Sequence, residues 1–122
     1  MNKEKLNKAI EKLKTDLDTG LLAVDIWDNK TGLSLASYNH NDRYSAIFGR
    51  IMNEIDRGLK DLGFPDFGEY QIIDLEMGSM LVFVKAKDKL FASCLLDKTK
   101  IQLGYLIAIT LPEFREMLEA AV

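Results

Sequence analysis

The chain has 122 residues, of which 48% are hydrophobic and 29% are charged. These proportions are typical of a globular domain and exclude a disordered or fibrous protein, and this length is enough to bury one core. We therefore expect a single domain over residues 1–122. The net charge of −3 argues against a nucleic-acid-binding surface, which carries a basic excess. One cysteine and the lack of a long apolar stretch predict a cytoplasmic protein without disulfides or membrane insertion.

The N-terminal third of the chain predicts a helix followed by a β-hairpin. Within residues 3–17, apolar residues recur at three- and four-residue steps, which is the period of an amphipathic helix with one buried face. Residues 21–27 and 33–38 read as strands. The turn-forming residues 28–32 lie between them and favour a hairpin.

Residues 44–62 predict a second, longer amphipathic helix. Its apolar stripe is wide, so the helix needs more than one surface to pack against. The stripe consists of Tyr44, Ile47, Phe48, Ile51, Met52, Ile55, Leu59 and Leu62. This width indicates that the helix lies at the edge of an interface or between two partners.

The C-terminal half predicts three strands and a last helix. The strands cover residues 70–77, 80–87 and 90–96, and the short turns between them make the neighbours antiparallel. A helix over residues 101–120 follows, which Pro112 is expected to kink or split because proline lacks a backbone donor.

The strands are apolar on both faces, so helices should cover both sides of the sheet. The predicted fold class is α/β of the α+β type. It has three layers, α/β/α, with a five-stranded antiparallel sheet. The element order is helix, strand, strand, helix, strand, strand, strand, helix.

The residue types needed for catalysis or cofactor binding are scarce. His40 is the only histidine and sits in a polar loop without a readable nucleophile, while Cys94 sits in an apolar strand and is expected to be buried and inert. The chain has no glycine-rich phosphate loop and no metal-ligand spacing. We therefore expect no enzyme activity, no cofactor and no metal.

The element order resembles the roadblock domain of dynein light chains and bacterial GTPase regulators. The residues that carry the resemblance are the hairpin of residues 21–36, the meander of residues 78–96 and the Leu103-Gly104 pair that opens the last helix. The resemblance implies a non-catalytic dimer that scaffolds complexes or binds a Ras-like small GTPase. It also implies that the opening strand of the meander pairs with its copy, that the middle helices pack side by side, and that the GTPase faces those helices.

The residues themselves also indicate a dimer. The strand 70–77 has no proline or lysine to block pairing, so its open edge favours a second copy. Gly49 and Gly58 lie in the middle helix, where small residues permit the close approach of another helix. The predicted homodimer interface comprises Tyr70, Ile72, Asp74, Gly49, Met52 and Gly58.

The polar side of the middle helix is the candidate partner-binding surface. Arg50 and Arg57 are seven residues apart and share one face, which they form with Asn53. The other interpretation is a solvated face on which Arg50, Glu54 and Arg57 are merely spaced charges. An alternative function is a profilin- or longin-like module, or a sensor, that binds a small ligand or peptide. Its pocket would be lined by aromatic residues, namely Trp27, Phe64 and Phe67.

Overall fold

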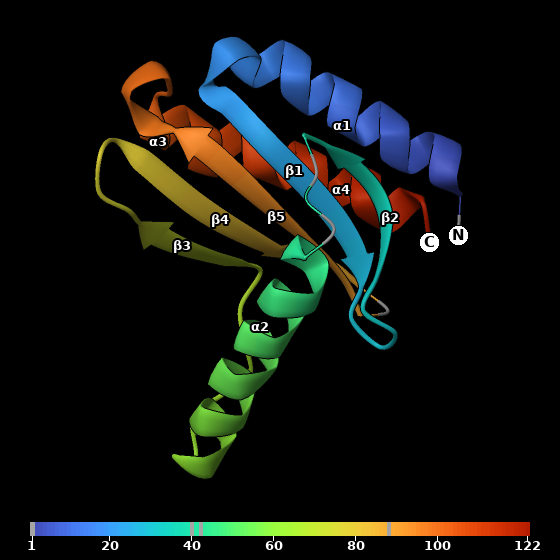
Figure 1. Cartoon of the computed structure of the whole chain (residues 1–122), viewed down its shortest axis with the longest axis vertical. Coiled ribbons are helices and arrows are strands. Elements are labelled where there is room, and N and C mark those ends of the chain that lie inside the picture. Colours follow the sequence, from blue (N-terminus) through green and yellow to red (C-terminus); the bar gives the residue numbers. More distant parts are fainter. Residues whose placement is uncertain (1, 40, 42, 88) are drawn as a thin grey trace.

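The computed structural model describes residues 2–39, 41, 43–87 and 89–122 (Figure 1). The helices and strands follow the predicted order. They are α1 (Lys3–Leu17), β1 (Leu21–Asp28), β2 (Leu33–Tyr38), α2 (Tyr44–Asp61), β3 (Tyr70–Asp74), β4 (Ser79–Lys85), β5 (Leu90–Asp97) and a last helical run of α3 (Leu103–Tyr105), the π-helical segment η3 (Leu106–Thr110) and α4 (Leu111–Ala120). Two single 3-10 turns, η1 (Asp18–Gly20) and η2 (Lys98–Lys100), complete the set.

The five strands form one antiparallel sheet in the order β2-β1-β5-β4-β3. The predicted fold class is confirmed, with three helices and a five-stranded antiparallel sheet among the residues that the structure describes. β3 pairs with β4 on one side only, so its other edge is open in the described part of the chain.

The hairpin turn between β3 and β4 begins earlier than the sequence pattern indicates. β3 ends at Asp74 rather than at residue 77. Met77 and Gly78 both have a positive φ, of 62° and 76°, which is the backbone of a type I′ turn and not of a strand. Met77 therefore lies at the tip of a hairpin with 99% of its surface exposed.

α1 and α4 cover one face of the sheet (Figure 1). The apolar stripe of α1 is buried as its spacing predicts, and the Asn2 side chain caps the helix by accepting a hydrogen bond from the Lys5 backbone N–H at 3.2 Å. The main core lies between these helices and the sheet. Its members include Leu6, Leu13, Val24, Ile26, Val82, Val84, Phe114 and Leu118.

α2 forms the third layer on the opposite face and covers it unevenly. Met52 of α2 packs on Trp27, Phe83 and Phe91, and Phe48 joins them with its ring centroid 5.3 Å from that of Phe83. The C-terminal half of α2 extends past the end of the sheet (Figure 1). Part of the sheet face and part of the apolar stripe of α2 are therefore left uncovered within one chain.

Pro112 does not split the last helix. The helical run of α3, η3 and α4 passes through it without a gap, and Pro112 lies in the first turn of α4. The departure from α-helical geometry is instead the π-helical segment η3, immediately before α4. The helix is therefore not split at Pro112, and the run departs from regular α-helical geometry in the π-helical segment just before this residue.

Candidate functional site

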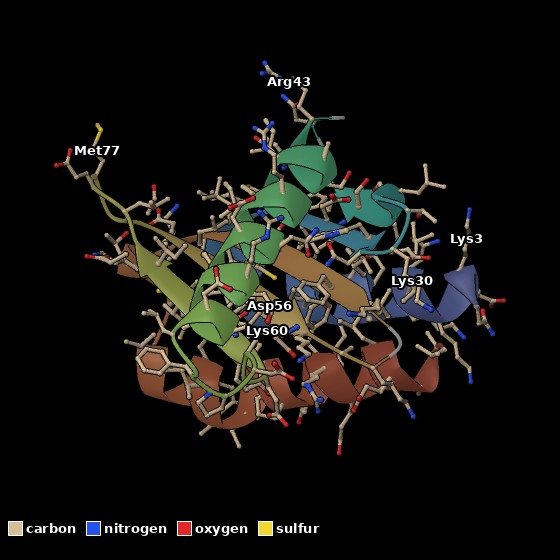
Figure 2. The ribbon with its side chains drawn as sticks, turned by 90° about the horizontal axis from the view of Figure 1, so that it is seen from below. Lys3, Lys30, Arg43, Asp56, Lys60 and Met77 are labelled. Atoms are coloured by element: carbon tan, nitrogen blue, oxygen red, sulfur yellow. The ribbon has the colours of Figure 1, made fainter. Side chains whose placement is uncertain are left out.

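α2 presents two different flanks to solvent. Residues Ile51 and Ile55 are 39% and 41% exposed, and with Gly58 they form the apolar flank, since residues three, four and seven apart share one side of a helix. Asn53 and Asp56 lie on the other side, the polar flank. Figure 2 shows Met77 at the β3–β4 turn and Lys30 after β1 on opposite sides of α2.

A mostly apolar hollow of about 230 Å³ adjoins the start of α2 where the helix leaves the sheet uncovered. Tyr44 and Phe48 contribute from α2, Leu81 from β4, and Leu75 follows β3. The hollow therefore lies between α2 and the half of the sheet that ends at the open edge of β3.

The open edge of β3 has a defined hydrogen-bonding register. Leu75 donates its backbone N–H to the Ser79 carbonyl at 3.0 Å, and Lys85 donates to the Glu69 carbonyl at 2.9 Å. Bonded and non-bonded pairs alternate in an antiparallel ladder, so the odd-numbered residues of β3 bond to β4. The even-numbered residues then direct their N–H and C=O groups outward. These are Tyr70, Ile72 and Asp74, the three strand residues of the predicted dimer interface.

The six predicted interface residues do not all lie at the surface. Ile72, Asp74 and Gly58 are exposed, and Tyr70 is half-buried, which raises the pKa of its phenol. Met52 is buried beneath α2 with 1% exposure. Gly49 is buried too, and a Cβ added there would lie 3.1 Å from Asn29 Oδ1. Its lack of a side chain is thus already explained by a close approach within one chain.

The three predicted partner-binding residues meet in one shallow groove of about 360 Å³ between α2 and the β1–β2 turn. Arg50 and Arg57 are both exposed there, and Arg57 pairs with Glu54 at 3.0 Å. Asn53 accepts a hydrogen bond from Asn29 Nδ2 at 2.9 Å, and Asn29 Oδ1 accepts one from Trp27 Nε1 at 3.1 Å. This chain of bonds fixes the groove to the aromatic cluster beneath α2.

A second groove, which the sequence did not reveal, adjoins the first along the polar flank. It encloses about 420 Å³ and shares Asn29, Lys30 and Asn53 with its neighbour. We call it the lysine groove. It is lined by Asn29, Lys30, Met52, Asn53, Asp56, Phe67, Lys85, Ala86, Lys87, Lys89 and Phe91. The alternation Lys85, Lys87, Lys89 at a predicted hairpin turn was the one available signal, but nothing in the sequence placed Lys30 beside it.

The aromatic residues considered for a ligand pocket do not come together. Trp27 is fully buried, Phe64 is 56% exposed, and of the three only Phe67 lines the lysine groove. The alternative pocket is therefore not formed as predicted.

Chemically reactive groups are sparse in the described part of the chain. Cys94 is 1% exposed, and its burial raises the pKa of the thiol to about 12, which keeps it in the unreactive form. Across residues 2–39, 41, 43–87 and 89–122 there is no group of three or more metal-ligating side chains. No helix in those ranges is both long and apolar enough to cross a membrane. His40 lies outside the described residues.

Solved structures share this architecture. The structure of MglB from Myxococcus xanthus superposes with a TM-score of 0.81 at 15% identity, covering 97% of this chain and 87% of that one. The chain therefore has the roadblock fold. The gliding protein MglB from Thermus thermophilus gives 0.78 at 18% identity, with 97% and 88% covered. The Roadblock/LC7 domain from Streptomyces avermitilis gives 0.74 at 9% identity, with 90% and 91% covered. The chain matches no protein-family model and no curated protein.

Proposed function

We propose that this roadblock-fold chain is a non-catalytic homodimeric adaptor that binds a Ras-like small GTPase and regulates or scaffolds it. The observation that carries the proposal is the continuity between the open β3 edge, the apolar hollow beside it and the apolar flank of α2. A second copy placed there covers all three at once.

The register of β3 supports a specific dimer. Pairing two β3 strands about Ile72 joins Ile72 to its counterpart and Tyr70 to the partner's Asp74. Each of these pairs exchanges two backbone hydrogen bonds, because the even-numbered residues direct both groups outward. The apolar flanks of the two α2 helices then face each other, with Ile51, Ile55 and the open space beside Gly58 at the contact.

The groove of Arg50, Asn53 and Arg57 is the proposed GTPase-facing surface. It lies on the solvent side of α2, and the resemblance to roadblock domains implies a partner that faces the middle helices. Its two arginines are exposed, and arginine is enriched in protein interfaces because one guanidinium makes several hydrogen bonds.

Biolayer interferometry with small GTPases from the same cell tests this proposal. Each GTPase is loaded with GDP or with a non-hydrolysable GTP analogue. We expect one GTPase to bind in a nucleotide-dependent manner, and R50A/R57A to weaken that binding about tenfold or more. The matched control is K3A/K8A, which removes the same charge from the distant helix α1. Absence of binding in both nucleotide states, or equal binding by both variants, would contradict the proposal.

A further inference from the structure

We propose that the lysine groove binds an acidic peptide segment of a partner protein, with carboxylates at its lysine rim and an apolar side chain on its floor. This inference stands apart from dimerisation, because it rests on the opposite flank of α2. The lysine groove adjoins the proposed GTPase-facing groove and shares Asn29, Lys30 and Asn53 with it, but its ligand is defined by the lysines of the β4–β5 turn rather than by Arg50 and Arg57.

The groove is preformed by hydrogen bonds that join three distant parts of the chain. The Asn29 backbone N–H donates to the Lys89 carbonyl at 2.9 Å, which ties the β1–β2 turn to the β4–β5 turn. The side chain of Asn29 donates to Asn53 of α2 at 2.9 Å. A site whose walls are already held in place loses less conformational entropy when a ligand binds.

The rim carries four lysines with no ion-pair partner in the described part of the chain. Among those residues, Lys30, Lys87 and Lys89 take part in no ion pair. The Lys85 ammonium donates to the Phe67 carbonyl at 3.5 Å and has no described acidic partner. Asp88, between two of these lysines in sequence, lies outside the described residues.

The one carboxylate among the described lining residues does not neutralise this rim. Asp56 already pairs with Lys60 at 3.0 Å, and Figure 2 shows the two together on α2. In a chain of net charge −3, most other lysines are paired with acidic neighbours. The lysine groove is therefore a site at which positive charge is available to an anionic partner.

The floor of the groove distinguishes a peptide from a simple anion. Phe67, which is half-buried, provides most of the apolar surface of the floor, and the almost fully buried Met52 and Phe91 lie beneath it; a phosphate ion cannot use such a surface. Several backbone N–H groups of the two turns already have acceptors: Lys30 donates to Asp28 and Leu90 to the Lys87 carbonyl. Lysine side chains from separate segments suit several carboxylates spaced along a chain.

The groove stays open in the proposed dimer. Asn53 and Asp56 line it from the polar flank of α2, and the apolar flank of Ile51 and Ile55 is on the other side of the same helix. Failure of the dimer would thus leave this proposal intact, and the reverse also holds.

Fluorescence anisotropy with a defined probe tests the groove. The probe is a fluorescein-labelled peptide of alternating aspartate and glutamate around a central Leu-Phe pair, titrated with the full chain at low salt. We expect saturable binding that K87E/K89E weakens about tenfold or more, because charge reversal repels the carboxylates. A single K30E variant from another segment should weaken it as well. Thermal melts confirm that each variant is folded.

Matched controls separate the groove from general electrostatics. K3E/K8E makes the same charge change on α1 and should change the affinity less than about twofold. A probe with Ser-Ser in place of Leu-Phe should bind several-fold more weakly because it lacks the apolar contact. The proposal is overturned if no saturable binding is seen, if K3E/K8E weakens binding as much as K87E/K89E, or if the two probes bind equally. Full displacement by millimolar inorganic phosphate at constant ionic strength would likewise overturn it and indicate a simple anion site.

Discussion

Replacing Ile72 by proline should dissociate the proposed dimer while leaving the monomer folded. The N–H of Ile72 points to the open edge of β3, since the odd-numbered residues of the strand make the bonds to β4. Proline removes only this outward donor, and edge strands tolerate proline where the N–H faces solvent. The same change at Ile73 removes a bond inside the sheet, so I73P should lower the melting temperature of the monomer itself.

The expected magnitude follows from the register. In a dimer centred on Ile72, the two copies of this residue exchange two hydrogen bonds, and I72P removes both. At a net value of about 1 kcal/mol for each bond, the loss is about 2 kcal/mol. This corresponds to a dissociation constant about 30-fold weaker. The pyrrolidine ring at the centre of the strand pair adds a steric cost, so this figure is a lower bound.

Sedimentation velocity at a series of micromolar concentrations measures the effect. I72V serves as the control, because valine keeps the N–H and the β-branched side chain, and it should sediment as the unmodified chain does. If I72P stays dimeric at concentrations at which I72V is dimeric, the two strands do not pair about Ile72. If I72P unfolds the monomer as I73P does, the N–H of Ile72 does not point to an open edge.

Further predictions concern the glycines, the hairpin tip and the thiol. G58A should raise the free energy of unfolding of the monomer by up to about 1 kcal/mol, because alanine favours the helix and the added Cβ meets no neighbouring side chain within 4 Å. The same substitution should weaken the dimer, because the added methyl group crowds the contact between the two α2 helices. Thermal melts with sizing show both effects, and G49A should gain no such stability because its Cβ presses on Asn29. M77N should raise the free energy of unfolding by about 1 kcal/mol in urea titrations, because asparagine tolerates the positive φ of this turn better than methionine. Cys94 should react with a thiol reagent only on unfolding, and labelling of the native chain at neutral pH would contradict its burial.

Local periodicity was sufficient to predict most of the elements. α1 matches residues 3–17 because its apolar residues keep the helical period over that range and Asn2 caps its start. β2 matches residues 33–38 because turn-forming residues bound it. The pattern of apolar residues predicted the wrong local structure where the backbone conformation, rather than the side-chain type, determines the element. Met77 is a good strand residue, but its positive φ places it in a turn, and η3 is a π-helical segment before Pro112 that no apolar spacing reveals.

The candidate sites were predictable only where one element supplies them. Arg50, Asn53 and Arg57 share a helix, so their spacing was enough to place them in one groove. The lysine groove was not predictable, because Lys30 and Lys87 become neighbours only when the β1–β2 turn bonds to the β4–β5 turn. Gly49 shows the same limit of reasoning from one element alone. Its small size suggested a helix partner, whereas Asn29 of the same chain occupies the space beside it.

Two copies of this chain are proposed to pair through the β3 edge and the apolar flank of α2. Light scattering on the unmodified protein, coupled to size-exclusion chromatography over a range of micromolar concentrations, measures the mass of the particle in solution. We expect a mass of twice the 13.8 kDa of one chain. A single peak at 13.8 kDa across that concentration range would contradict it.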